Sequence, residues 1–131
     1  MKNYLFNILS SIIAFYIPFQ IALLTGLPLV KNLILLIFSI QWISFIPAYI
    51  FQTEKFFDLT GSITYLTTVL AALYITDSGK ISDYVIVSCV VIWAIRLGSF
   101  LCMRIHKAGE DRRFREIKTN FTRFFMTWTL Q

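Results

Sequence analysis

Long apolar segments alternate with short polar ones along this chain. Four segments are long enough for membrane-spanning helices, namely residues 4–24, 33–51, 59–75 and 84–103. The first holds 21 residues without a formal charge, and as a helix it would extend about 31 Å, close to the roughly 30 Å hydrocarbon thickness of a bilayer. The pattern predicts an all-α, multi-pass transmembrane bundle with four full spans and the start of a fifth.

Polar and turn-forming residues separate the apolar segments. Residues 25–28 contain a Gly/Pro break, residues 52–58 form a polar and aromatic link, and residues 76–83 have the composition of a loop. Pro18 and Pro47 lie inside apolar segments. Membrane helices tolerate internal prolines, so each is expected to mark a kink and not a helix end.

The composition excludes several classes of protein. Hydrophobic residues make up 57% of the 131 residues and charged residues 15%, whereas soluble domains are about 45–50% apolar and about 25% charged. A lipid bilayer is therefore the expected partner, and nucleic acid is not. A signal peptide starting at residues 1–3 is disfavoured because the apolar segment is too long and no cleavage site follows. No motif with metal-ligand spacing occurs.

The basic residues are concentrated near the carboxyl end. Residues 104–123 hold seven Lys/Arg against three Asp/Glu. Cytoplasmic placement of this segment, after four spans, also makes the amino terminus cytoplasmic, with nine Lys/Arg inside and two outside. Residues 121–130 cover only half a bilayer as a helix. Either they begin a span of a longer protein, or a partner completes the bundle, or the tail lies flat on the membrane. Trp128 is also expected among the aromatic residues at the membrane interface.

Arg96 interrupts the fourth apolar segment. A cation at the centre of a span costs at least about 2.5 kcal/mol, so we expect either contact with an anion or cofactor or a side chain that snorkels to the surface. Helical spacing gives this segment two faces. One presents Trp93, Arg96, Ser99, Phe100 and Met103, and the other presents the small residues Ala94, Gly98 and Cys102.

The third apolar segment begins with residues that can form hydrogen bonds. Asp58, Ser62 and Tyr65 share one helical face, and the neighbouring face carries Thr60, Thr64, Thr67 and Thr68. These side chains would bind a head group, a cofactor or a substrate carbonyl. In the structural alternative, Asp58 caps the helix and the hydroxyls bond to their own backbone or to a neighbouring helix.

The basic segment after the fourth span contains helix-end signals. Gly109 is typical of a helix stop, and Asp111 of the cap of a new helix. We expect an amphipathic helix with an apolar face and two ion pairs at i, i+4 spacing; the face would hold Phe114, Ile117 and Phe121, and the pairs would be Asp111–Arg115 and Arg112–Glu116. Such a helix would lie on the membrane, or its guanidinium groups would form a pocket for phosphate.

Three separated blocks occur in order, at residues 57–65, 93–98 and 104–114. The second and third fit a W-x-x-R-L pattern followed by an R-x-x-x-x-G-x-D-x-R-aromatic loop through Trp93, Arg96, Leu97, Arg104, Gly109, Asp111, Arg113 and Phe114. In these blocks, and over essentially its whole length, the chain resembles the steroid 5-alpha-reductase-like membrane family, and most closely the mainly bacterial branch of that family. An inner-membrane location in a bacterium is the expectation that follows.

The resemblance implies a six- or seven-span bundle of which residues 1–131 form the amino-terminal part. It implies reduction of a carbon–carbon double bond conjugated to a carbonyl in a lipophilic small molecule, with NADPH as cofactor. Activity would then require a complementary carboxy-terminal half, or assembly as a homo-oligomer. The alternative hypothesis is a small non-catalytic membrane protein that binds anionic lipid or a membrane partner through its basic helix.

Site residues follow from the same resemblance. Arg96, Arg104, Asp111 and Arg113 are the expected cofactor-binding residues, and Asp58 is a further candidate. Tyr65 and Glu54 are the candidates for the catalytic group that polarises the substrate carbonyl, and no metal ligand is expected.

Overall fold

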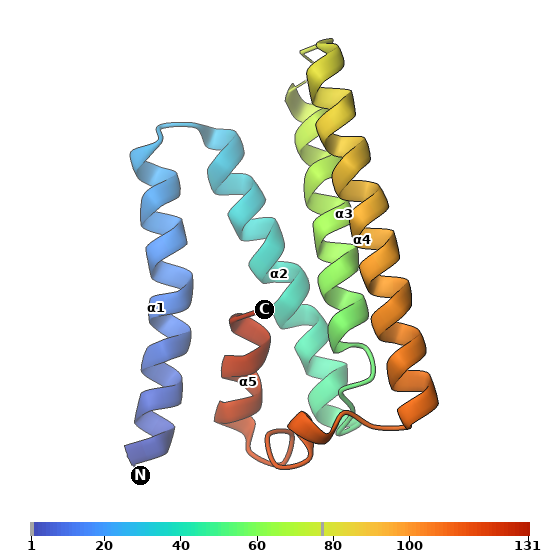
Figure 1. Ribbon diagram of the computed structural model, residues 1–131. Helices are drawn as coiled ribbons and strands as arrows, with labels where there is room; N and C mark the ends of the chain where they lie inside the picture. The colour runs from blue at the N-terminus through green and yellow to red at the C-terminus, as the bar shows by residue number, and fades with distance from the viewer. Residues whose placement is uncertain (1, 77) are drawn as a thin grey trace.

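The computed structural model describes residues 2–76 and 78–131, and over these residues its regular structure is entirely helical. The elements are α1 (Lys2–Leu24), α2 (Pro28–Ile50), α3 (Phe57–Thr76), α4 (Ile81–Ala108), the short 3₁₀ helix η1 (Arg112–Phe114) and α5 (Phe121–Thr129) (Figure 1). The helices α1 to α4 are each long and apolar enough to cross a membrane. The predicted all-α multi-span fold is confirmed.

The helices extend beyond the apolar segments that predicted them. Helix α2 begins at Pro28, because a proline at the first helical position forfeits no helical hydrogen bond. Helix α4 continues past Met103 to Gly109, where a φ of 78° ends it as expected. Both helices with an internal proline continue through it. Met1 and Asp77, which belong to the segments 1–3 and 76–83 discussed above, lie outside the described residues.

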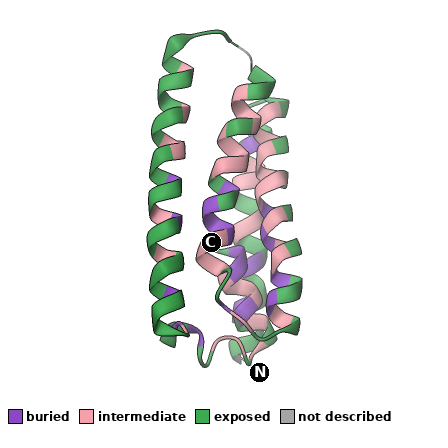
Figure 2. Cartoon of the chain, turned by 90° about the vertical axis from the view of Figure 1, so that its right-hand side faces the viewer, coloured by how far each residue is buried: buried purple, intermediate pink, exposed green. Residues whose placement is uncertain are grey.

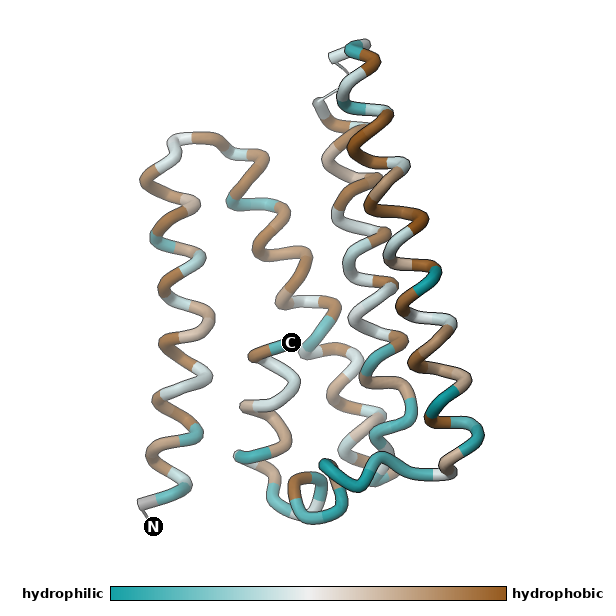
Figure 3. Tube along the Cα trace, in the orientation of Figure 1, coloured by the Kyte–Doolittle hydropathy of each residue, from teal (hydrophilic) through white to brown (hydrophobic). Residues whose placement is uncertain are grey.

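The helices stand side by side in chain order, and α5 enters the bundle between α1 and α2, contacting both (Figure 1). The α2–α3 link and the segment 109–120 lie at the same end as the amino terminus. Figure 3 shows the hydrophilic residues gathered at that end, below the mainly apolar helices. Most outward helix surface is exposed and apolar, and the buried positions form a narrow interior (Figure 2), as expected for helices surrounded by lipid.

The main core lies near the charged end and includes α5. It joins residues from α2, η1 and α5, namely Phe45, Ala48, Phe114, Phe124 and Trp128. Phe124 and Trp128, four residues apart on one face of α5, are completely buried. The expectation that Trp128 lies at the membrane interface is therefore wrong. The alternative of a tail lying flat on the membrane is wrong for the same reason, because the apolar face of α5 is covered by the bundle.

Helices α3 and α4 pack closely through small residues. Ala94 is completely buried and Gly98 is buried, whereas Cys102, the third residue of the expected ridge, is exposed. A Cβ atom added to Gly98 would lie 2.5 Å from Ser62 Oγ. The small-residue contact is thus confirmed for Ala94 and Gly98.

The segment after Gly109 does not form the expected amphipathic helix. Only η1 is helical before α5, and residues 115–119 form turns. The expected ion pairs at i, i+4 spacing are absent from the described residues, because Arg115 pairs with Glu110 and Asp111 pairs with Arg113. The reason is tertiary: Phe114 is drawn into the core, where its ring lies 4.8 Å from the ring of Phe57, and a compact turn brings it there.

Candidate anion-binding site

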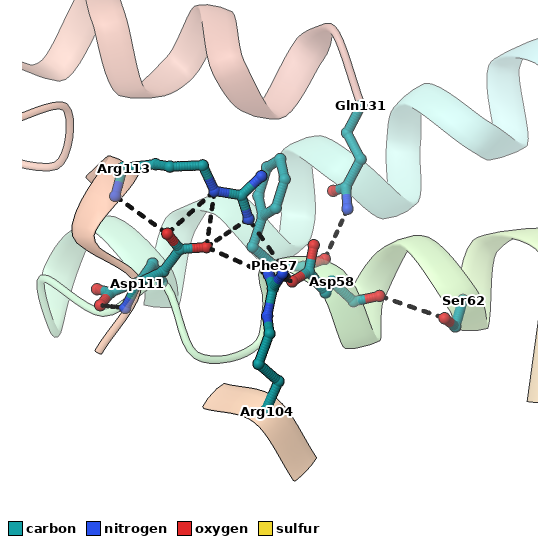
Figure 4. A network of polar contacts seen from close by, with 8 residues as sticks. Phe57, Asp58, Ser62, Arg104, Asp111, Arg113 and Gln131 are labelled. Carbon is teal, nitrogen blue, oxygen red and sulfur yellow. Dashed lines mark hydrogen bonds and ion pairs between the residues drawn. The ribbon is translucent and has the colours of Figure 1, made fainter. Parts of the chain in front are cut away.

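Charged side chains from three segments meet at the end of the bundle where α3 begins and α4 ends. Asp58 comes from the first turn of α3, Arg104 from the last turns of α4, and Asp111 and Arg113 from the segment around η1 (Figure 4). The structure therefore brings together four of the five residues expected to bind a cofactor. We call these four residues the charged cluster.

Local sequence explains how Asp111 and Arg113 come together. Gly109 turns the chain out of α4, and the Asp111 side chain then caps η1 by accepting a hydrogen bond of 3.0 Å from the Arg113 amide. The Arg113 side chain returns to the same carboxylate, with Nε 3.0 and 2.9 Å from its two oxygens and an ion pair from Nη2. Asp111 thus caps the helix as predicted.

The hydrogen bonds from Arg113 lower the pKa of the Asp111 carboxyl below its usual value of 3.8, although burial of that carboxyl acts in the opposite direction. The same contact raises the pKa of Arg113. Both groups are consequently charged at neutral pH.

Arg104 links the two carboxylates of the cluster. Its Nη2 lies 3.7 Å from Asp58 Oδ2 and 3.8 Å from Asp111 Oδ2, and Arg113 Nη2 lies 4.0 Å from Asp58 Oδ2. The carboxylate side chains are 15% and 8% exposed, whereas those of Arg104 and Arg113 are 48% and 61% exposed. The carboxylates therefore form the floor of the cluster, and the guanidinium groups keep donors that face outward.

Glu54 holds the basic segment in place from the α2–α3 link. Its Oε1 accepts a hydrogen bond of 3.1 Å from the Asp111 amide, and its Oε2 accepts one of 3.0 Å from Lys118 Nζ. The Glu54 side chain is only 2% exposed. Both carboxylate oxygens are thus used to fasten one segment to the other, and the candidate catalytic residue Glu54 points toward residues of the protein.

A depression of about 550 Å³ lies beside the charged cluster. Four arginines contribute to its wall, together with Ile105, Ala108 and two acidic residues; the arginines are Arg104, Arg112, Arg113 and Arg115, and the acids are Glu110 and Asp111. More guanidinium than carboxylate groups surround it. Since guanidinium groups bind phosphate and carboxylate oxygens through paired N–H donors, the depression suits an oxyanion.

Arg96 and Tyr65 lie apart from this depression. Arg96 lines a second hollow on the outward face of α4, together with Trp93 and Phe100. Tyr65 is 47% exposed, and its ring packs edge-on against Trp93 with ring centres 5.1 Å apart. The structure therefore separates Arg96 from the other expected cofactor residues.

The hydroxyl groups of α3 follow the structural alternative. Four of these hydroxyls donate a hydrogen bond of 2.7 to 3.3 Å to the backbone carbonyl four residues earlier. They belong to Ser62, Thr64, Thr67 and Thr68. Thr64 Oγ1 also accepts a hydrogen bond from Gln41 Nε2 at 3.3 Å. These hydroxyls serve backbone and interhelical bonding, and Asp58 is the residue of this face that enters the site.

Sequence reasoning missed the partners that orient the site. Lys118 and Glu54 are 64 residues apart, and Gln131 Nε2 donates to the Phe57 carbonyl at 2.7 Å, next to Asp58 (Figure 4). Helical spacing reports only neighbours three or four residues apart. A single sequence gives no information on contacts between such distant residues. The polar character of the α2–α3 link was the one feature that could have drawn attention to Glu54.

Comparison with known proteins gives one family. A family model described as "Protein of unknown function (DUF1295)" matches residues 44–131, a range that contains the whole charged cluster, Glu54, Tyr65 and Arg96. No curated protein and no solved structure matches the chain.

Proposed function

The chain belongs to the DUF1295 family, whose members are steroid 5-alpha-reductase-like, and from this premise we propose that it is the amino-terminal part of a membrane-bound, NADPH-dependent reductase. Its substrate class would be a lipophilic molecule with a carbon–carbon double bond conjugated to a carbonyl. The observation that carries the proposal is the convergence of Asp58, Arg104, Asp111 and Arg113 beside an arginine-lined depression.

The residues of the depression fit the phosphate groups of such a cofactor. The side chains of Arg104 and Arg113 are about half exposed, and each guanidinium group contacts a carboxylate of the cluster. The several contacts of Arg113 with Asp111 orient its guanidinium group before the anion arrives and lower the ordering cost of binding. Arg112 and Arg115 add positive charge at the rim.

The chemistry supplied by NADPH, when bound, is hydride transfer to the carbon β to the substrate carbonyl. A hydrogen-bond donor on the carbonyl oxygen would stabilise the negative charge that develops there. Tyr65 suits this role better than Glu54. The Tyr65 ring is half exposed within the membrane-spanning part of α3, whereas both oxygens of Glu54 already accept hydrogen bonds.

A complementary carboxy-terminal half, or a second copy of the chain, would supply the remaining part of the cofactor site and would enclose the substrate. The cofactor contact expected for Arg96 stays a prediction. The non-catalytic alternative receives less support, because Phe114 of the basic segment is buried in the core and the segment offers no continuous apolar face to a membrane.

NADPH titration of the chain in lipid nanodiscs, with and without a co-expressed carboxy-terminal half, tests the proposal. We expect saturable binding in the completed protein, weakened about tenfold or more by Arg104→Gln or Arg113→Gln, since each removes a charge-assisted contact. Arg123→Gln, at an exposed arginine of α5 outside the depression, is the matched control. No binding by the completed protein would overturn the cofactor assignment.

A further inference from the structure

The second hollow lies on the side of α4 opposite Ala94 and Gly98, and its lining includes Trp93, whose ring packs edge-on against Tyr65 of α3. The hollow has a volume of about 570 Å³ and is lined by Trp93, Arg96, Leu97, Ser99, Phe100 and Met103. The opposite face of α4 carries the buried Ala94 and Gly98 that pack against α3. The hollow therefore opens sideways from the bundle at the depth of the lipid chains.

Arg96 is the one charged residue of this hollow, and it has no partner among the described residues. By contrast, Arg104, Arg113, Arg115 and Lys118 all form ion pairs with carboxylates. Arg96 is exposed and makes neither an ion pair nor a side-chain hydrogen bond within residues 2–76 and 78–131. An oxyanion ligand would supply the counter-charge and hydrogen-bond acceptors that the Arg96 guanidinium group lacks.

Snorkelling toward the charged end is an unfavourable solution for Arg96. The residue lies eight positions before Arg104, about 12 Å along the helix. Side chains of a helix lean toward its amino end, and the amino end of α4 is the end opposite the charged cluster (Figure 1). The natural direction of the Arg96 side chain is thus away from the nearer polar surface.

The charge also selects the occupant of the hollow. A second copy docked symmetrically on this face would bring two Arg96 side chains together without a counter-charge. Any anion from the bilayer must leave the head-group level and move about two helical turns to reach Arg96, and a phospholipid would have to bring a bulky head group and two chains with it. A long-chain carboxylate has a small planar head that matches a guanidinium group through two parallel hydrogen bonds, and an apolar tail that suits Trp93, Phe100 and Met103.

We propose that the hollow on α4 is a binding site for a long-chain carboxylate, with its head on Arg96 and its tail along the Trp93–Phe100–Met103 surface. This inference depends on the surroundings of Arg96 and not on the proposed reductase function. Trp93 lies in the site itself and supplies a direct spectroscopic probe.

The test uses the full chain in phosphatidylcholine nanodiscs and 9,10-dibromostearate, whose bromine atoms quench nearby tryptophan fluorescence. We expect saturable quenching by the acid and only weak, non-saturating quenching by its methyl ester. Trp93→Phe should remove the saturable component, leaving the emission of Trp42 and Trp128. Arg96→Gln should raise the half-saturating concentration about tenfold or more, and Arg96→Lys should raise it less, because lysine lacks the planar fork.

Lys107→Gln is the matched control, since it removes one exposed cation of α4 outside the hollow and should leave binding unchanged. Circular dichroism melts of each variant distinguish a lost site from a lost fold; if Arg96→Gln is unfolded, the comparison of acid with methyl ester in the unmodified chain decides. Equal quenching by both compounds, or unchanged binding in a folded Arg96→Gln variant, would overturn the proposal. A component of Trp93 quenching by brominated phosphatidylglycerol, but not by brominated phosphatidylcholine, that Arg96→Gln removes would overturn it in favour of a lipid phosphate.

Discussion

Glu54 is the residue on which the position of the basic segment depends most directly. Its two carboxylate oxygens receive the Asp111 amide and the Lys118 ammonium group, and its side chain is 2% exposed. In Glu54→Gln one of these donors would face the amide –NH₂ group, so a buried donor loses its acceptor. We expect the free energy of unfolding to fall by about 2 kcal/mol, measured by denaturant titration in detergent micelles followed by circular dichroism.

Glu116→Gln provides the control for this substitution. Glu116 is exposed and forms no ion pair among the described residues, so its replacement should change the free energy of unfolding by less than about 0.5 kcal/mol. Equal stability of the two variants would show that the contacts of Glu54 do not hold the segment.

The pKa of Asp111 gives a second prediction at the scale of the residue. Because Arg113 lowers this pKa below 3.8 in the folded chain, the contribution of Asp111 to stability is complete above about pH 4 and is lost as the pH falls through the folded-state pKa. We expect the melting temperature of the unmodified chain to fall below about pH 4 more steeply than that of Asp111→Asn. Asparagine keeps the cap of η1 but not the charge.

Glu116→Gln serves again as the reference in that pH series, and it should retain the acid-dependent fall of the unmodified chain. Parallel curves for the unmodified chain and Asp111→Asn would mean that Asp111 does not couple proton binding to folding.

At the scale of the helix, the packing of α3 against α4 depends on the absence of a side chain at Gly98. An added Cβ would lie 2.5 Å from Ser62 Oγ and 2.8 Å from Ser62 Cβ. Rotation of the Ser62 side chain could move Oγ, but Ser62 Cβ is fixed to the backbone of α3, so the helices must separate. We expect Gly98→Ala to lower the free energy of unfolding by about 1–3 kcal/mol, measured by the same denaturant titration.

Ser62→Gly removes both obstructing atoms. The double variant Ser62→Gly/Gly98→Ala should therefore be more stable than Gly98→Ala alone, even though each glycine in a helix carries its own entropic cost. Equal stability of the single and double variants would mean that the destabilisation does not arise from the Ser62 contact.

The helices could be predicted from the sequence wherever the signal was local. Apolar length predicted α1 to α4, Gly109 and Asp111 marked the end of α4 and the start of η1, and helical spacing separated the Arg96 face from the Gly98 face. The same reasoning failed for residues 111–121, where the burial of Phe114 outweighs the i, i+4 pairs that would have favoured a helix.

The residues of the charged cluster were singled out from the sequence, but the ion pairs between them could not be predicted. The resemblance to the reductase-like family selected Arg104, Asp111 and Arg113, with Asp58 as a further candidate, and the structure brings these four side chains together. Their pairing depends on how far α3 and α4 are offset along each other, which is set by the fit of Gly98 on Ser62. The Glu54–Lys118 pair joins residues on either side of the α3–α4 hairpin in the sequence, and no local periodicity predicts such a contact.

At the scale of the whole molecule, the charged cluster, the basic segment and the amino terminus share one end of the bundle (Figures 1 and 3). The excess of Lys/Arg at this end predicts that it faces the cytoplasm. The opposite end carries the α1–α2 and α3–α4 connections, in which Lys80 precedes α4. If the anion-binding depression is to receive a cytoplasmic cofactor, this orientation is required.

Cysteine labelling from each side of the membrane tests the orientation. In a background with Cys89→Ser and Cys102→Ser, Lys80→Cys should react with a membrane-impermeant maleimide added outside spheroplasts, because Lys80 is exposed at the end opposite the cluster. Lys107→Cys, exposed at the charged end, should react only after the membrane is permeabilised. The reverse pattern would place the arginine-lined depression outside the cell, where the proposed NADPH site would have no supply of its cofactor, and the reductase proposal would fall with it.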